Sequence, residues 1–207
     1  MEGRGQTEKR ESLNFADLSI EVAQGTPEEQ EAFLLMLELS GGRTLRRFFG
    51  PRFQRVFGRL FKQETTLFGF PHCLVLRQRG QILGMALRWK KEVRKTQSRA
   101  TALYLFPYVL PHLLLSLPLL QDMLRMGIPE EAYYVSNIAI FPPHQGKGLG
   151  GFLLDFLEEE AKRCGVKKVI LDVEKENERA LQFYRKQGYT VFRESRHFVR
   201  MEKGGLS

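Results

Sequence analysis

The sequence predicts one α/β domain of the α+β type, and three observations support this. The chain has 207 residues, a length that suits one domain or one domain with an insertion. Apolar residues make up 43% of the chain, which is enough to fill a core. Short apolar runs and amphipathic helical repeats succeed one another along it. We expect residues 1–12, which are polar and charged, to be a flexible tail and 13–207 to form the domain.

Capping and turn residues mark the ends of the first elements of the domain. Leu18–Val22 alternates as a short strand. Thr26 is then a helix N-cap within a capping box, and the pair Gly41-Gly42 is expected to end that helix. Further along, two apolar runs within residues 73–89 flank Arg79-Gly80, which predicts a β-hairpin.

A basic segment without any acidic residue lies at 43–62. Its aromatic side chains recur every four residues, at Phe49, Phe53, Phe57 and Phe61. This spacing predicts a helix with one apolar and one basic face, divided at Gly50-Pro51. Packing into a core is favoured over base stacking. The alternative is that the basic face selects an acidic substrate or touches nucleic acid or anionic lipid.

Residues 100–121 carry no formal charge and are numerous enough to span a bilayer. However, Pro107, Pro111 and Pro118 each remove a backbone donor. In lipid, such breaks need neighbouring helices to satisfy the freed carbonyls, and the sequence offers no second span. We therefore predict extra helical segments at about 43–62 and 100–128, the second being broken and either buried or lining a cleft.

The second half of the domain has the order strand, helix, strand, helix and hairpin. Residues 133–141 form an apolar strand, and apolar positions between 149 and 161 mark an amphipathic helix. Residues 166–173 are a buried strand. Asn177 is a plausible cap for a helix that ends at Gly188, and residues 189–201 contain a closing hairpin.

A glycine-rich loop joins the first of these strands to its helix. It reads Pro142-Pro143-His144-Gln145-Gly146-Lys147-Gly148-Leu149-Gly150-Gly151. Glycines expose consecutive N–H groups and the helix adds its positive dipole end, so we expect a pyrophosphate there, with Lys147 as a further charge. A dinucleotide fold would also show G-x-G-x-x-G, with Asp172 as the ribose acid. The chain after Gly151 is too short for its doubly wound sheet.

These residues resemble the GNAT superfamily of acetyl-CoA-dependent N-acyltransferases. Its cofactor motif, Q/R-x-x-G-x-G/A after a strand, is matched at 145–150. A second match follows in order, comprising Leu171-Asp172-Val173, Asn177, Ala180, Phe183-Tyr184 and Gly188-Tyr189. The resemblance covers about residues 133–189. It implies a mixed, mostly antiparallel sheet flanked by helices and splayed between its fourth and fifth strands.

The resemblance also implies how acetyl-CoA is held. Pantetheine would pair with the fourth strand like an added strand, and an N–H near Ile140 would hold the developing oxyanion. The glycine loop would take the pyrophosphate, and Asn177 would contact the pantetheine arm. The implied cofactor contacts are Ile138, Ala139, Ile140, Gln145, Gly146, Lys147, Gly148, Leu149, Gly150, Asn177 and Tyr184.

Acyl transfer to an amine needs a neutral amine, a stabilised oxyanion and a proton for the departing thiolate. Tyr184 matches the family's general acid, since a phenol is protonated at neutral pH. Asp172 lies where some members carry a glutamate base, although a structural pairing with a lysine such as Lys168 is an open alternative. Glu174, on the same strand face, is the second choice for the base.

The remaining assignments concern the acceptor and the reaction route. Ser136 and Asn137 are expected to position the amine. Cys73 and Cys164 are expected to be small core residues, so neither a metal site nor a covalent nucleophile is predicted. The predicted activity is N-acetyltransferase transfer from acetyl-CoA to a primary amine within a ternary complex. The apolar residues 103–120 are a hypothetical pocket for longer acyl chains.

Partners and location are predicted more coarsely. The net charge of +8 favours an anionic partner, which a phosphate-rich cosubstrate satisfies. Nucleic acid and membrane are not the expected partners, and family analogy implies a homodimer. The absence of an apolar signal region and of paired cysteines predicts a cytoplasmic location. The alternatives are an acyl-CoA sensor or scaffold without catalysis and a membrane or nucleic-acid adaptor. The acceptor amine is not identified.

Overall fold

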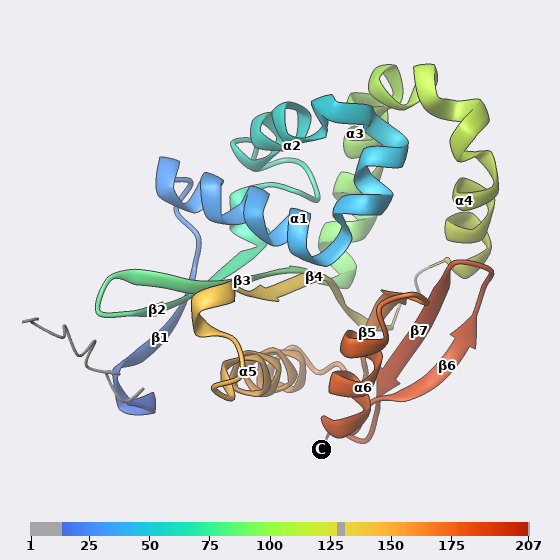
Figure 1. Cartoon of the computed structure of the whole chain (residues 1–207). Helices are drawn as coiled ribbons and strands as arrows, with labels where there is room; N and C mark the ends of the chain where they lie inside the picture. Colours follow the sequence, from blue (N-terminus) through green and yellow to red (C-terminus); the bar gives the residue numbers. More distant parts are fainter. Residues whose placement is uncertain (1–13, 128–130, 207) are drawn as a thin grey trace, which may run out of the picture.

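The computed structural model describes residues 14–127 and 131–206, so the tail predicted at 1–12 lies outside the described residues. A seven-stranded sheet crosses the molecule in the order β1-β2-β3-β4-β5-β7-β6 (Figure 1). Its strands are β1 (Leu18–Val22), β2 (Cys73–Gln78), β3 (Gln81–Trp89), β4 (Tyr133–Ile140), β5 (Val169–Glu174), β6 (Thr190–Glu194) and β7 (Phe198–Lys203). Only β4 and β5 are parallel neighbours. The predicted mixed, mostly antiparallel sheet is confirmed.

Helices cover both faces of this sheet (Figure 1). On one side lie α1 (Pro27–Phe49), α2 (Phe53–Phe61), α3 (Lys91–Val109) and α4 (Leu113–Met126). On the other lie α5 (Leu149–Arg163) and α6 (Glu178–Lys186). Two main apolar clusters fill the spaces between these layers. Because strand residues alternate in direction, neighbours such as Tyr133 and Tyr134 of β4 belong to opposite clusters.

Helix α1 begins as predicted and bends where the glycine pair lies. The Thr26 hydroxyl accepts a hydrogen bond from the Glu29 N–H at 3.2 Å, and the Glu29 carboxylate accepts one from the Thr26 N–H at 3.1 Å. Helical geometry breaks at Gly41, where φ is −163° and ψ is 15°, and then resumes as far as Phe49. The glycine pair therefore makes a kink rather than the predicted end.

The basic segment packs as its aromatic spacing predicts. Phe49, Phe53, Phe57 and Phe61 are all buried in the core cluster on the α1 side. The short turn η2 (Gly50–Arg52) divides the segment at the predicted position. Ring pairs fix the packing, with the Phe49 and Phe57 centroids 5.1 Å apart in an edge-to-face arrangement.

The proline-broken segment is helical, but it is only half buried. The turn η4 (Leu110–His112) interrupts it between α3 and α4. One face packs inward through Thr101, Ser116 and Leu119, whereas the opposite face is exposed. The prediction of a buried or cleft-lining element is therefore wrong for the outer face. Within the described residues, no helix has both the length and the apolar character needed to cross a bilayer.

An ion pair between Arg88 of β3 and Glu160 of α5 joins the sheet to a covering helix. The guanidinium Nε donates to the carboxylate at 3.1 Å, and both side chains are largely buried. Burial alone would raise the pKa of Glu160, but hydrogen bonds and charge from Arg88, with hydrogen bonds from Tyr133 and Lys90, lower it to about 2. The folded state therefore holds this carboxylate in its charged form.

Glu160 is expected to make folding stability fall as acidity rises. Because its pKa drops from 4.5 in the unfolded chain to about 2 on folding, its stabilisation is present above pH 4.5 and is lost between there and about pH 2. We expect an effect on the order of 1–2 kcal/mol after solvent screening. Urea unfolding of Glu160→Gln should show a shallower pH dependence than the natural chain over this window. The exposed neighbour Glu159→Gln serves as the control, and equal slopes for Glu160→Gln and the natural chain would contradict the prediction.

Candidate active site

The sheet opens between β4 and β5. Their parallel pairing is limited to Tyr133–Val135 with Val169–Leu171, which is three residue pairs. A register shift on the other edge of β4 pairs Leu87 with Asn137 but Arg88 with Val135, so Ser136 is an extra residue. Such a bulge bends its strand and increases its twist, which accounts for the separation of β4 from β5 just beyond Val135. The predicted splay is confirmed.

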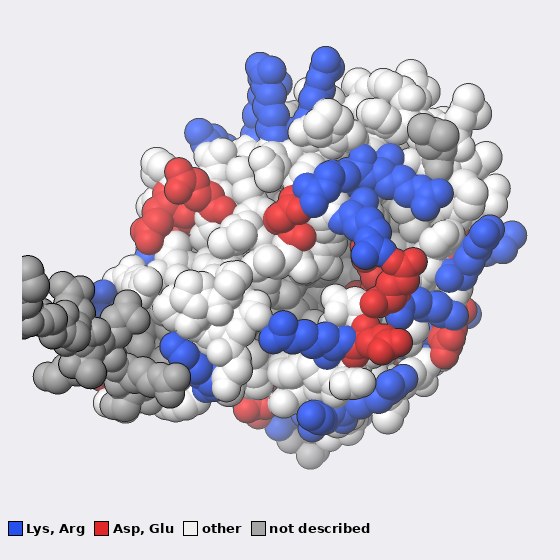
Figure 2. Space-filling view, viewed as in Figure 1, with Lys and Arg blue, Asp and Glu red and all other residues white. Residues whose placement is uncertain are grey.

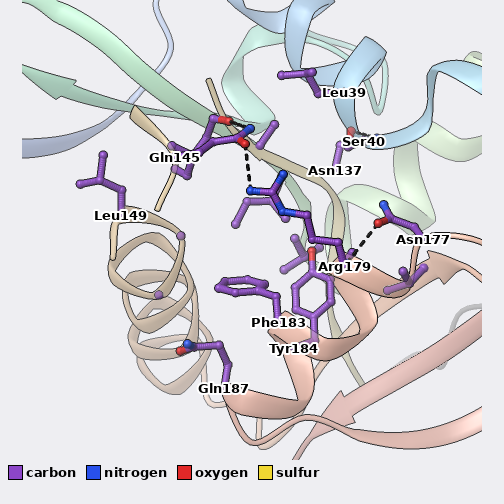
Figure 3. Close-up of a pocket in the computed structure, with 18 of the residues that line it drawn as sticks. Leu39, Ser40, Asn137, Gln145, Leu149, Asn177, Arg179, Phe183, Tyr184 and Gln187 are labelled. Atoms are coloured by element: carbon purple, nitrogen blue, oxygen red, sulfur yellow. Dashed lines mark hydrogen bonds between the residues drawn. The ribbon is translucent and has the colours of Figure 1, made fainter. Parts of the chain in front are cut away.

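A cavity of about 750 Å³ occupies this opening (Figure 3). Residues 136–140 of β4 form one wall, α6 forms another, and the glycine loop closes one end. The predicted cofactor contacts that line it are Ile138, Ala139, Ile140, Gln145, Gly146, Gly148, Leu149, Gly150, Asn177 and Tyr184. Both predicted acceptor-positioning residues, Ser136 and Asn137, line it as well. Lys147 does not line the cavity, so the structure gives its predicted contact no support.

The glycine loop presents bare backbone to the cavity. Gly146 and Gly148 have φ values of 75° and 82°, a left-handed conformation that disfavours other residues. Gly148 is the N-cap of α5, and no side chain caps the first turn. The N–H groups at the start of this helix therefore remain available for an anion, together with the positive end of the helix dipole.

Gln145 and Arg179 connect the loop to the rest of the site. The Gln145 amide donates to the Ile140 carbonyl at 2.8 Å and accepts from the Arg179 guanidinium at 3.2 Å. Figure 3 shows Arg179 reaching from the start of α6 toward Gln145. The exposed cation beside the loop is thus Arg179, whereas the sequence had pointed to Lys147 for this charge. Arg179 could have been identified from the sequence, because it lies in the first turn of the helix that Asn177, a predicted cavity residue, caps.

Tyr184 lies at the centre of the α6 wall. Its ring is buried, and Figure 3 shows its hydroxyl directed into the cavity. Burial raises the pKa of this phenol, so it keeps its proton at neutral pH. The residue packs edge-to-face against Tyr189, with ring centroids 5.8 Å apart. A protonated hydroxyl facing an open cavity is able to donate to a bound group.

Asp172 has a different position from the one its predicted role requires. Its two oxygens accept hydrogen bonds from Nε and Nη2 of Arg200, both at 2.7 Å, and Tyr134 donates at 2.9 Å. It does not line the cavity. Because both oxygens of this carboxylate are occupied by Arg200 and Tyr134, away from the cavity lining, this placement does not favour Asp172 as the base. The structural alternative fits better, although the partner is Arg200 and Lys168 pairs instead with Glu202.

Glu174, the second choice, does reach the cavity. It lines both the main cavity and an adjoining one of about 380 Å³. The Thr44 hydroxyl donates to the Glu174 carboxylate at 2.5 Å and fixes it across the site. Thr44 follows the kink of α1, and sequence reasoning did not identify it. The visible signal was the Gly41-Gly42 break, which brings this part of α1 over the strand ends.

The same kink supplies a polar chain on β4. The Asn137 side-chain NH₂ donates to the Ser40 hydroxyl at 2.8 Å, and the Ser136 hydroxyl donates to the Asn137 side-chain oxygen at 2.9 Å. Ser40 and Leu39 line both cavities, yet neither was predicted. Cys73 is buried as expected, whereas Cys164 is exposed, contrary to the core position predicted for it. Neither thiol lines either cavity.

The sheet that opens between β4 and β5, the glycine loop and the Tyr184 hydroxyl in the cavity are features to compare with known proteins. The model of the acetyltransferase (GNAT) family matches residues 43–189. This chain belongs to the GNAT family. The match includes the basic segment and the proline-broken helices, for which the sequence offered no recognisable motif.

Solved structures show the same fold. This GNAT chain is similar to an N-acetyltransferase from Staphylococcus aureus, with a TM-score of 0.66 and 17% identity, over 89% of this chain and 100% of that one. It is also similar to the PaiA N-acetyltransferase from Thermoplasma acidophilum, which was solved in complex with coenzyme A. There the TM-score is 0.55 and the identity 15%, over 90% of this chain and 98% of that one.

Curated relatives match a shorter stretch. One is the L-methionine sulfoximine/L-methionine sulfone acetyltransferase of Salmonella typhimurium, 38% identical over 55 residues. Another is the L-amino acid N-acyltransferase MnaT of Escherichia coli, 36% identical over 55 residues. In both cases the match covers 27% of this chain and spans only 32% of the relative's length.

Proposed function

We propose that this GNAT-family chain is an acetyl-CoA-dependent N-acetyltransferase that transfers acetyl to a primary amine within a ternary complex. One observation supports this above all. The edge of β4 that faces the opening leads directly to the uncapped first turn of α5, with a cation beside it. An extended pantetheine arm ending in a diphosphate has this shape and charge. The cavity volume is typical of small-molecule sites.

Within this proposal, the chain's own groups bind and orient the cosubstrate. The main chain of residues 138–140 would pair with the pantetheine arm, and an N–H near Ile140 would stabilise the developing oxyanion. Gln145 holds the loop to β4 through its amide, so the main-chain N–H groups of the loop would contact the diphosphate. Arg179 would add the charge first assigned to Lys147. The Asn177 side-chain oxygen already accepts from the Ala180 N–H and caps α6, which leaves its NH₂ group for the arm.

Proton transfer would use two groups that line the cavity, one on α6 and one at the end of β5. Tyr184 would donate a proton to the departing sulfur, since burial keeps its hydroxyl protonated. Glu174, rather than Asp172, would accept the proton of the incoming amine, directly or through a water, with Thr44 holding its carboxylate. Ser136 and Asn137 would orient that amine through the chain that ends at Ser40.

The acceptor is proposed to be a small zwitterionic amine such as an amino acid. The adjoining cavity is lined by the carboxylates of Glu38, Glu174 and Glu176 and by Arg43 and Arg46. Arg43 pairs with Glu176 and Arg46 with Glu38, so an acceptor that carries both an amine and a carboxylate would exchange into these pairs. The names of two curated relatives point to acceptors of this kind.

The test combines binding with turnover. Calorimetric titration with acetyl-CoA should show binding, and release of free thiol should follow with amino acids more than with polyamines or peptides. A lack of affinity for every acyl-CoA tried would overturn the proposal. Binding without thiol release from any amine would favour a sensor or scaffold instead.

Gly148→Ala is expected to weaken acetyl-CoA binding by at least about tenfold. A side chain at a φ of 82° strains the loop and displaces the N–H groups that face the cavity. Gly165→Ala is the matched control. It also has a positive φ, 69°, but lies beyond the other end of α5, with open space around the added methyl. Both variants should lose similar stability by thermal unfolding, and only the first should lose affinity by calorimetry; equal affinities would contradict the assignment.

A further inference from the structure

An exposed apolar stripe runs over α3, η4 and α4. Its members are Leu103, Phe106, Leu110, Leu114, Leu117 and Leu124. They recur mostly at intervals of three or four residues, so they follow one face of the broken helix. Leu114, the most exposed of them, has 88% of its surface open to solvent. The opposite face of the same helices packs on the core, so the stripe is not a frayed or unfolded region.

A row of arginines borders this stripe. Arg52 at the end of η2 and Arg55 and Arg59 of α2 are exposed, again three and four residues apart. None of them forms an ion pair with another residue in the described part of the chain. Arg59 lies within electrostatic range of Tyr104 on α3. Figure 2 shows basic side chains projecting at the top of the molecule beside an uncharged surface over α3 and α4.

We propose that this face binds the surface of an anionic lipid bilayer. The stripe would enter the boundary between headgroups and acyl chains, while the arginine row would contact the negative headgroups. This mode requires no spanning helix, and none of the described helices is both long and apolar enough to be one. It revises the expectation that a membrane is not a partner, and it joins the anionic-lipid alternative for the basic segment 43–62 to the exposed apolar residues of 100–121.

Charge argues for lipid over a second copy of the chain. A symmetric dimer through this face would bring two sets of Arg52, Arg55 and Arg59 together without intervening acids in the segment 43–62. Like charges at an interface oppose association. An anionic bilayer turns the same arginines into attractive contacts. The proposal is independent of the acetyltransferase assignment, because it involves neither cavity.

Co-sedimentation with lipid vesicles tests the proposal. The natural chain should bind vesicles that contain phosphatidylglycerol, bind phosphatidylcholine vesicles far less, and lose binding as salt rises. Leu114→Glu should weaken binding to the anionic vesicles at least about tenfold. Arg55→Glu/Arg59→Glu should do the same for anionic vesicles. Phe192→Glu, an exposed apolar position on β6, is the matched control and should change nothing.

Every variant should keep the natural melting temperature and the natural acetyl-CoA affinity, which excludes loss of folding as the cause. Failure to bind phosphatidylglycerol vesicles at low salt would overturn the proposal, as would binding that Leu114→Glu leaves unchanged. Sedimentation velocity supplies a further outcome. If Leu114→Glu turns a dimer into a monomer and no vesicle binding is seen, this face joins two copies and the lipid proposal is wrong.

Discussion

Replacing Tyr184 by phenylalanine is expected to lower kcat at least about 100-fold, while the affinity for acetyl-CoA changes little. The thiolate that leaves a thioester needs a proton, and the Tyr184 hydroxyl faces the cavity from the middle of α6. Because burial raises its pKa, this hydroxyl is present as the acid across the neutral range. Phenylalanine keeps the ring packing and removes only the donor.

The measurement is thiol release under saturating acetyl-CoA and amine, with calorimetry for the cosubstrate. Tyr189→Phe is a close control, since its ring packs against Tyr184 but its hydroxyl is buried beside Glu158 and the residue does not line the cavity. That variant should retain kcat within about twofold, as expected for a group outside the reaction. A Tyr184→Phe enzyme as fast as the natural one would show that another group protonates the sulfur.

Asp172→Ala is expected to lower the free energy of unfolding by about 3–5 kcal/mol. The change leaves the Arg200 guanidinium without its carboxylate, and Arg200 is only 1% exposed. An uncompensated buried charge is costly because no water replaces the lost partner. Arg200 also donates to the Met126 carbonyl at the end of α4, so the loss is expected to loosen that helix end as well. Urea unfolding monitored by circular dichroism measures the effect.

Glu174→Gln provides the contrasting result for the same strand. We expect kcat at neutral pH to fall about 100-fold, because the amide no longer accepts a proton. Stability should change much less, since Glu174 is partly exposed and Thr44 retains a hydrogen-bond acceptor in the variant. If Asp172→Ala were fully stable and inactive while Glu174→Gln kept its rate, the base would be Asp172, as first predicted.

The fold was largely predictable because its signals are local. Strand periodicity, the Thr26 cap and the helix that starts after Asn177 depend on neighbours within one turn or one strand. The glycine loop was also predictable, because its glycines themselves indicate a backbone conformation that other residues disfavour. The role of Asp172 was not, because its partner Arg200 comes from β7, and the register of β5 against β7 leaves no mark in either strand.

The sequence also did not predict which face of an apolar helix would be buried. The composition of residues 100–121 shows only that the segment avoids charge. Which side of it meets the core depends on α1, whose Arg47 carbonyl accepts a hydrogen bond from Ser116. The α1 residues of the site were missed for a related reason. Ser40, which lines both cavities, lies directly before the bend at Gly41, and Thr44, which donates to Glu174, lies just beyond it.

The short pairing of β4 with β5 has a mechanical consequence. Strands β1 to β4 form one panel and β5, β7 and β6 form another, joined in the sheet by three rungs of backbone pairing. A ligand bound along the open edge of β4 would link the two panels, in place of the backbone pairing that the bulge at Ser136 removes. Amide exchange in the carboxyl-terminal panel would then report on filling of the gap, slowing as the hinge between the panels stiffens.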